Sequence, residues 1–261
     1  MADGDVYKKI AGTWTLIGSI AGPPGRAKTA VGVFASLPTT GMAAGDSYKC
    51  TDSPHEFIYQ GGSWQAFVGG LEATPVILSD LTVVNQGGST ISQQGASVLI
   101  LDPSGGGSLA NHLRLALQAV PSAPYKYTII ADIVMAQCDY NQVGICLYDS
   151  GSGKLVMHNI CSSNSVSNTG YLLQSGTLNS VTSFNAEYAH EFYTCPSRII
   201  MRIRDDGTNR YFGISADGFT FWEYTSSTNT DWITPTHIGF YANANNGGQQ
   251  VTITVHSATV S

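Results

Sequence analysis

The sequence is poor in charged side chains, and this shortage excludes several classes of protein. Only 11% of the 261 residues are Asp, Glu, Lys or Arg, whereas an ordinary soluble domain has about 25%. The 12 basic and 18 acidic residues give a formal charge of −6, so the chain lacks the basic face with which proteins neutralise nucleic-acid phosphates. Exposed helices normally carry charged pairs on their solvent side. Surface polarity that comes from Ser, Thr, Asn and Gly is instead typical of β-sheets and their turns.

The sequence also lacks the segments that mark membrane, exported and zinc-binding proteins. No apolar run approaches the roughly 18 residues of a membrane span, so we expect no membrane insertion. The first residues, MADGDVYKK, are acidic where a signal peptide has a basic flank, and we expect no export signal. The five cysteines are odd in number and form no C-x-x-C pair, which argues against a disulfide framework or a zinc site. We expect reduced thiols and synthesis in a reducing cytoplasm.

A repeated pattern stands near the N-terminus. Residues 4–14 and 45–64 both contain Gly-Asp-x-Tyr-Lys, then a glycine-containing turn, then a tryptophan. Glycine supplies the positive φ angle that a tight turn needs, so each copy predicts a β-hairpin. Between the copies, residues 21–25 read AGPPG, a single collagen-like triplet that Lys28 interrupts. This segment predicts a stiff connector and excludes a collagen rod.

These two units resemble short modules of bacteriophage tail-fibre and virion fibre proteins. The resemblance is carried by GDVYKKIAGTWTLIGSIAGPPG at residues 4–25 and by FASLPTTGM, GDSYK and WQAF within residues 34–67. It implies that residues 1–70 are N-terminal fibre or attachment modules, with sub-units at about 1–22 and 33–68. It also implies contacts with other virion proteins through residues 1–70.

A second region follows Gly69-Gly70, a flexible pair after which a proline soon appears. We assign residues 71–75 to a linker and residues 76–261 to a second domain. Its short apolar runs alternate with polar residues and end in turns such as Asp206-Gly207. Residues 112–118 also fit a helix, but the prolines that follow favour a strand. Regular strands without helices between them predict an all-β fold, with an antiparallel β-sandwich after the small N-terminal β-hairpin modules.

The C-terminal region resembles the concanavalin A-like lectin/glucanase jelly roll. The resemblance rests on RIIMRIRDDGTNRYFGISADGFTFWEY at residues 198–224 and on the later runs 237–242 and 251–260. It covers roughly residues 76–261. Because lectins, glycosidases and structural modules share this fold, it implies the architecture and leaves the activity open.

Catalytic patterns are missing from the sequence. Glycosidases of this fold class carry a Glu-x-Asp-x-x-Glu type strand, and no glutamate here has that context. Glu187, His190 and Glu191 form an acidic cluster that we expect in a solvent-exposed loop. There is no G-x-S-x-G or H-E-x-x-H motif, and only Asp139 with Asn141 resembles the Ca²⁺ ligands of legume lectins. We therefore expect a non-enzymatic protein with no catalytic residues, no metal site and no cofactor.

Sugar binding uses aromatic rings with planar polar side chains beside them. On that basis we selected seven candidate glycan-binding residues. They are Arg202, Arg204, Tyr211, Trp222, Tyr224, Trp232 and Asn243. Arg202 and Arg204 should share a solvated face opposite Met201, and Trp232 should lie in an exposed loop.

The leading interpretation is a bacteriophage virion structural protein, such as a tail fibre, spike or head fibre, whose sandwich binds a host-surface glycan. We expect it on the virion surface after synthesis in the host cytoplasm. Residues 1–70 offer only a few short strands, too few to enclose a core, so we expect self-association. The resemblance to phage fibre modules implies that the assembly is a homotrimer. The alternatives are a carbohydrate-binding module of a cellular adhesin and a glycosidase of the same fold.

Overall fold

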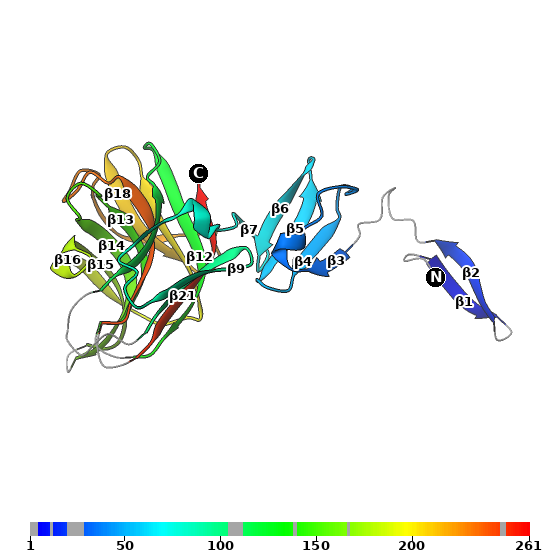
Figure 1. Cartoon of the computed structure of the whole chain (residues 1–261), viewed down its shortest axis with the longest axis horizontal. Coiled ribbons are helices and arrows are strands. Elements are labelled where there is room, and N and C mark those ends of the chain that lie inside the picture. The colour runs from blue at the N-terminus through cyan, green and yellow to red at the C-terminus, as the bar shows by residue number, and fades with distance from the viewer. Residues whose placement is uncertain are drawn as a thin grey trace. The chain divides into compact units, whose positions relative to one another are not determined.

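The computed structural model describes residues 5–10, 13–19, 29–103, 112–137, 140–165, 168–245 and 249–261 (Figure 1). Besides strands, these residues form two short 3-10 helices, η1 (Phe34–Ser36) and η2 (Leu78–Asp80). In these ranges no helix has the length and apolar character to cross a membrane. The chain divides into two compact units, an N-terminal unit, Met1–Glu72, and a C-terminal unit, Ala73–Ser261.

The N-terminal unit contains a two-stranded hairpin and a five-stranded sheet with the order β3-β4-β5-β6-β7. The hairpin is β1 (Asp5–Ile10) with β2 (Thr13–Ser19), and the sheet strands are β3 (Thr29–Gly32), β4 (Ser47–Cys50), β5 (His55–Gln60), β6 (Ser63–Val68) and β7 (Leu71–Ala73). β3 and β4 run parallel, whereas β4, β5 and β6 are antiparallel. Part of the expected linker 71–75 therefore forms an edge strand.

The five-stranded sheet encloses a small core of its own. Tyr48, Phe57 and Val68 are buried, and the Tyr48 hydroxyl donates a hydrogen bond to the Val33 carbonyl at 2.9 Å. This corrects our expectation that residues 1–70 have too few strands to enclose a core. The error arose because the sequence pattern indicated hairpins and did not reveal that β3 joins them in parallel.

The C-terminal unit consists of two antiparallel seven-stranded sheets. Sheet I has the order β19-β18-β17-β12-β21-β10-β9, and sheet II has the order β16-β15-β14-β13-β20-β11-β8. The strands of sheet I are β9 (Thr90–Gln94), β10 (Ser97–Asp102), β12 (Tyr125–Met135), β17 (Arg198–Asp205), β18 (Asn209–Ser215), β19 (Trp222–Thr228) and β21 (Val251–Val260). The strands of sheet II are β8 (Thr82–Val84), β11 (Arg114–Ala119), β13 (Gln142–Tyr148), β14 (Leu155–Ser165), β15 (Asn168–Ser180), β16 (Ser183–Tyr193) and β20 (His237–Asn243). The predicted all-β class with an antiparallel sandwich is confirmed.

The main core fills the space between the two sheets. Ile129, Met201 and Phe212 of sheet I and Ile145 and Phe240 of sheet II are fully buried members of one cluster. Because successive strand residues point to opposite faces, the residues between them point to the outer face of each sheet. None of the four described cysteines forms a disulfide with another described residue.

One boundary differs from the sequence pattern. The sequence pattern after the Ala216-Asp217-Gly218 turn predicts a strand over Phe219–Tyr224, but β19 begins at Trp222. Asp217 Oδ1 accepts hydrogen bonds from the backbone N–H groups of Phe219 and Thr220 at 2.9 and 2.8 Å. An aspartate that bonds its own downstream backbone holds those residues in a turn. Residues 112–118, in contrast, contain the predicted strand, β11.

Candidate functional site

Three of the predicted residues lie together on the outer face of sheet I. Arg202 and Arg204 belong to β17, where Met201 and Ile203 alternate with them and point into the core. Tyr211 of β18 is the cross-strand partner of Arg204. The solvated face predicted from the alternation is therefore present.

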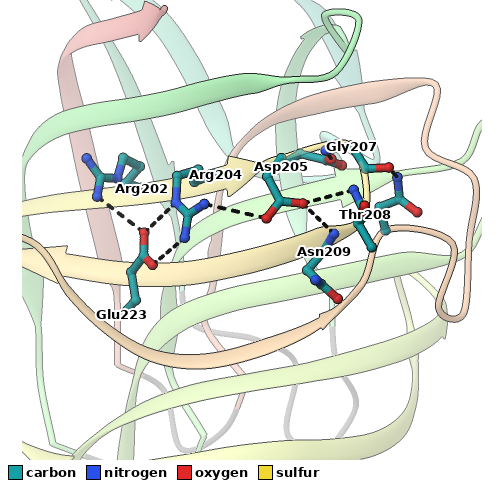
Figure 2. Close-up of polar contacts among 9 residues, drawn as sticks. Arg202, Arg204, Asp205, Gly207, Thr208, Asn209 and Glu223 are labelled. Carbon is teal, nitrogen blue, oxygen red and sulfur yellow. Dashed lines mark hydrogen bonds and ion pairs between the residues drawn. The ribbon is translucent and has the colours of Figure 1, made fainter.

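Glu223 of β19 joins the two arginines (Figure 2). Its Oε1 accepts hydrogen bonds from Arg204 Nε at 2.8 Å and from Arg202 Nη2 at 3.3 Å, and its Oε2 accepts from Arg204 Nη2 at 2.7 Å. This two-point contact with Arg204 lowers the pKa of Glu223 and raises that of Arg204. The carboxylate is thus committed to the protein's own cations.

Both guanidinium groups also stack on aromatic rings. The guanidinium carbon of Arg204 lies 3.7 Å from the centroid of the Tyr211 ring, and that of Arg202 lies 3.7 Å from the centroid of Phe221. Arg204 Nη1 is also 3.8 Å from Asp206 Oδ2. Much of the donor capacity that a sugar would need is therefore used within the protein.

The turn between β17 and β18 is closed by its own aspartates (Figure 2). Asp206 Oδ1 accepts hydrogen bonds from the backbone N–H groups of Thr208 and Asn209 at 2.9 and 2.8 Å, and Asp205 Oδ1 accepts from that of Gly207 at 2.8 Å. These bonds fix the hairpin that carries the arginines and keep Asp206 beside Arg204.

Trp222 and Tyr224 do not join the arginine cluster. Trp222 is 51% exposed, and its ring centroid is 5.9 Å from that of Tyr224. Tyr224 packs against the core, with its hydroxyl 2.8 Å from His158 Nδ1 and 2.6 Å from Ser175 Oγ. Tyr224 therefore connects the two sheets, and its hydroxyl is occupied.

Trp232 and Asn243 occupy two further places. The Trp232 ring packs against the core, its Nε1 donates to the Leu178 carbonyl at 3.2 Å, and Lys154 Nζ lies 4.2 Å from its centroid. Asn243 is fully buried in sheet II, where its Oδ1 accepts from the His112 N–H at 2.9 Å. The exposed tryptophan expected in this loop is instead half-buried, and the seven residues do not form one site.

A row of polar side chains crosses the outer face of sheet II. Tyr241, Asn159, Gln174 and His190 are cross-strand neighbours on β20, β14, β15 and β16, and Gly144 of β13 stands between the first two. A Cβ atom at Gly144 would lie 2.1 Å from a carbonyl oxygen of β14. The close approach of these strands therefore leaves room for no side chain at that position.

Hydrogen bonds connect this face from its buried centre to its edge. Asn243 Nδ2 donates to Gln142 Oε1 at 3.4 Å, Gln142 Nε2 donates to Gln174 Oε1 at 3.2 Å, and Gln174 Nε2 donates to Glu187 Oε1 at 3.0 Å. His190 Nδ1 lies 3.2 Å from the same oxygen of Glu187. Each amide fixes the orientation of the next, so the position of the Glu187 carboxylate is set by buried partners.

The edge strand β16 exposes one aromatic ring on each side of this carboxylate along the strand. Phe192 is 69% exposed and Phe184 is 42% exposed. Their cross-strand partners on β15, Leu172 and Leu178, lie on the outer face, so the two rings do as well. We call Phe184, Glu187, His190 and Phe192 the β16 rim. The acidic cluster that we expected in a loop is thus part of a strand.

Behind the rim lie buried polar atoms with unused hydrogen-bonding capacity. Asn159 and Tyr241 are fully buried, and burial raises the pKa of the Tyr241 hydroxyl well above its usual value. Although the two groups are neighbours, neither makes a hydrogen bond of normal geometry within the described ranges. Buried polar atoms without such partners are uncommon and are often completed by water or a ligand.

The acidic residues of this region do not form a carboxylate pair. Glu187 pairs with Gly176, on the outer face, whereas Glu191 pairs with Leu173, which belongs to the core. The two carboxylates therefore point to opposite sides of β16.

The structure does not bring together a metal site within its described part. No group of three or more His, Cys, Asp or Glu side chains suited to a metal ion occurs there. Asn141 Oδ1 accepts a hydrogen bond from the Asn245 N–H at 3.1 Å, and Asp139, its proposed companion, lies outside the described residues.

Gln142, Asn159 and Gln174 were not among the predicted binding residues. Gln142 begins an otherwise apolar strand, and that signal was available, but the strands of Asn159 and Gln174 carry several other polar residues. The proximity of the three side chains could not be read from the sequence, because it depends on the order in which the strands pair.

No protein-family model matches the chain, and no curated protein sequence matches it either. Among solved structures, the chain is similar to a functionally unknown protein from Saccharomyces cerevisiae, with a TM-score of 0.53, 14% identity, and coverage of 71% of this chain and 98% of that chain. It is also similar to a mutant of the GH43 protein BlXynB from Bacillus licheniformis, with a TM-score of 0.53 and 12% identity. That match covers 72% of this chain but only 38% of the other.

At such low identities the likeness concerns the fold alone. The antiparallel two-sheet sandwich expected for the C-terminal region is confirmed. Because one fold hosts many unrelated functions, the sandwich leaves open whether the chain is an enzyme.

Proposed function

We propose that the C-terminal unit binds a neutral glycan at the β16 rim. One observation carries the proposal: a chain of buried amides ends on Glu187, an exposed carboxylate flanked by the exposed rings of Phe184 and Phe192. Sugar sites combine aromatic faces with planar polar groups held in fixed orientations. The rim offers both on one strand.

The chemistry of the rim defines the class of sugar. Glu187 accepts hydrogen bonds from sugar hydroxyls, and His190 beside it supplies a second polar group. Phe192 offers its ring to the apolar face of a pyranose. A carboxylate repels acidic sugars, so we expect neutral sugars to be preferred. A single open site of this kind binds weakly, with a Kd on the order of 1 mM, and several copies are needed for avidity.

We further propose that the chain is a structural protein of a bacteriophage virion, a tail fibre, spike or head fibre. The resemblance of residues 4–68 to fibre modules supports this. In this proposal residues 1–70 contact other virion proteins and sister chains, and the sandwich meets host-surface carbohydrate. The protein is made in the host cytoplasm and ends on the virion surface. Gold-labelled antibody seen on intact particles by electron microscopy tests the location.

A binding role without catalysis is favoured because Glu187 and Glu191 face opposite sides of β16. Two-carboxylate hydrolysis needs both acids on the same substrate. A glycosidase would release reducing sugar from polysaccharides that the protein binds, and such release would contradict the proposal. A cellular adhesin module remains the alternative if the protein is found on cells and not on particles.

A glycan array with the full chain tests the binding site. We expect neutral glycans to bind the unmodified protein and Phe192→Ala to lose about two- to tenfold in affinity, since an aromatic contact contributes about 0.5–1.5 kcal/mol. Phe219→Ala is the matched control, because Phe219 is 81% exposed on the turn before β19. Equal binding by both variants would contradict the assignment to the rim.

A further inference from the structure

The N-terminal unit contains a cleft of about 360 Å³. Three of its lining side chains are aromatic, and three others are aliphatic or thioether groups. The lining residues are Phe34, Leu37, Pro38, Thr39, Met42, Tyr59, Gly62, Ser63 and Trp64. Its volume falls within the range of small-ligand sites, roughly 300–1,000 Å³.

The cleft is an uncovered continuation of the core face of the sheet. By strand alternation Tyr59 shares a face with buried Phe57, and Trp64 shares one with buried Ala66. Yet Tyr59 and Trp64 are only half-buried. The aromatic surface therefore extends beyond the part that the unit itself covers.

The wall of the cleft is fixed by a direct contact. Trp64 Nε1 donates a hydrogen bond of 2.7 Å to the Pro38 carbonyl, which anchors the segment after η1 to β6. The Tyr59 and Trp64 rings meet edge to face, with centroids 5.3 Å apart. The Gly61-Gly62 turn beside them has φ angles of +58° and +88°, which favour glycine. This edge of the cleft therefore carries no side chains. The cleft is thus preformed.

The lining points to a neutral sugar ring as the occupant. None of the residues that line it is charged, so a charged ligand would find no counter-charge. Aromatic faces suit the C–H face of a pyranose, and the exposed hydroxyl of Thr39 offers a hydrogen bond to a sugar hydroxyl. The Ser63 hydroxyl already bonds the Gln60 carbonyl and the Gln65 amide. We propose that this cleft is a second glycan-binding site, specific for neutral sugars and independent of the β16 rim.

The site would give one chain two sugar contacts, and repeated chains more. Linked weak sites raise the overall affinity without any new contact at either one. The proposal does not require the rim, because the cleft is formed within the N-terminal unit alone.

The test uses the full chain carrying both Phe192→Ala and Glu187→Gln, so that two changes together weaken binding at the β16 rim. Isothermal titration measures binding of neutral trisaccharides of glucose, galactose and N-acetylglucosamine. We expect at least one to bind, Tyr59→Ala to weaken that binding about tenfold, and Thr39→Arg to abolish it by filling the cleft. Val31→Arg is the matched control, since Val31 is 65% exposed and does not line the cleft.

Several outcomes would overturn the proposal. They are the absence of binding by all three trisaccharides, equal binding by the Thr39→Arg and Val31→Arg proteins, and binding of a decaproline peptide in place of sugar. A change of oligomeric state in Thr39→Arg alone, measured by sedimentation, would also overturn it, because the cleft would then be a contact between copies. Thr39 is exposed, so its replacement remains informative if Tyr59→Ala fails to fold.

Discussion

The buried amide of Gln174 donates a hydrogen bond of 3.0 Å to Oε1 of Glu187, an exposed carboxylate on the neighbouring strand. Gln174 is only 6% exposed, and its side-chain oxygen Oε1 accepts a hydrogen bond from Gln142 Nε2. The carboxylate is thus open to solvent while its orientation is set from inside the sheet. A group positioned before a ligand arrives loses less entropy on binding.

Replacing Glu187 with glutamine tests this relationship. Glu187→Gln removes the charge that accepts hydrogen bonds from sugar hydroxyls, and charge-assisted bonds are about twice as strong as neutral ones. We expect about tenfold weaker glycan binding in titration, with a change in unfolding free energy within about 0.5 kcal/mol because the site is exposed. Glu191→Gln, on the opposite side of β16, is the control and should bind normally. Equal losses in both variants would count against the rim.

On the outer face of sheet I, the alternation of residues along a strand predicted where the arginines lie but not which residue they bind. Arg202 and Arg204 were correctly placed opposite Met201, because strand periodicity requires it. Glu223 was not recognised as their partner, since a β-bulge between β18 and β19 shifts its register and no local pattern reveals that. The fold class was predictable because it follows from periodicity and turns, whereas the sites depend on strand order.

Trp232 illustrates an error of a different kind. A tryptophan in a polar loop was expected to be exposed, but its backbone adopts a φ of +66° and its ring packs against the core. The flanking residues carry no signal of this conformation. The Trp232 ring is held in place by its hydrogen bond to the distant Leu178 carbonyl.

Trp232→Ala should therefore lower stability and leave glycan binding intact. A fully buried aromatic replaced by alanine costs about 3–5 kcal/mol, and for this half-buried ring we expect about 2 kcal/mol. Urea unfolding measures the effect, with Phe219→Ala as an exposed aromatic control. If Trp232→Ala abolished glycan binding at unchanged stability, the residue would belong to a site as the sequence analysis first held.

The Arg204–Glu223 pair should contribute modestly and in a pH-dependent way. Because the pair is partly exposed, a double-mutant cycle with Arg204→Ala and Glu223→Gln should give a coupling of about 1 kcal/mol. The folded pKa of Glu223 is lowered, chiefly by its hydrogen bond with Arg204. The stabilisation of the fold by this ion pair is therefore fully present above the unfolded-state pKa of Glu223, about 4.3, and is lost as the pH falls through its folded-state pKa. A coupling that does not decrease as the pH falls below the unfolded-state pKa would contradict this.

Self-association stays a prediction, although the N-terminal unit has a core. The fibre resemblance implies a homotrimer, and weak sugar sites benefit from multiple copies. Sedimentation equilibrium of the full chain at micromolar concentration should give three times the 27.6 kDa of one chain. A fragment of residues 76–261 should be a folded monomer. A folded full-length monomer at that concentration would rule out the trimer.

His158 lies between the two sheets in a geometry that fixes its proton. Nε2 is 3.1 Å from the Gly213 carbonyl, which can only accept, so Nε2 carries the hydrogen. Nδ1 then accepts from the Tyr224 hydroxyl at 2.8 Å, and Ser175 Oγ donates to that hydroxyl at 2.6 Å. A second proton on His158 would break this arrangement. Burial accordingly lowers the pKa of His158 to about 4.

This histidine should make the protein less stable in mild acid. The unfolded chain takes up a proton near pH 6.5, whereas the folded chain resists protonation down to about pH 4. The unfolding free energy therefore does not depend on the titration of His158 above about pH 6.5, and it falls by up to about 3 kcal/mol between pH 6.5 and pH 4. His158→Gln keeps one donor and one acceptor without titrating. Urea unfolding at pH 7.5, 6 and 5 should show a steeper decline for the unmodified protein. Equal slopes would mean that folding does not lower the pKa of His158.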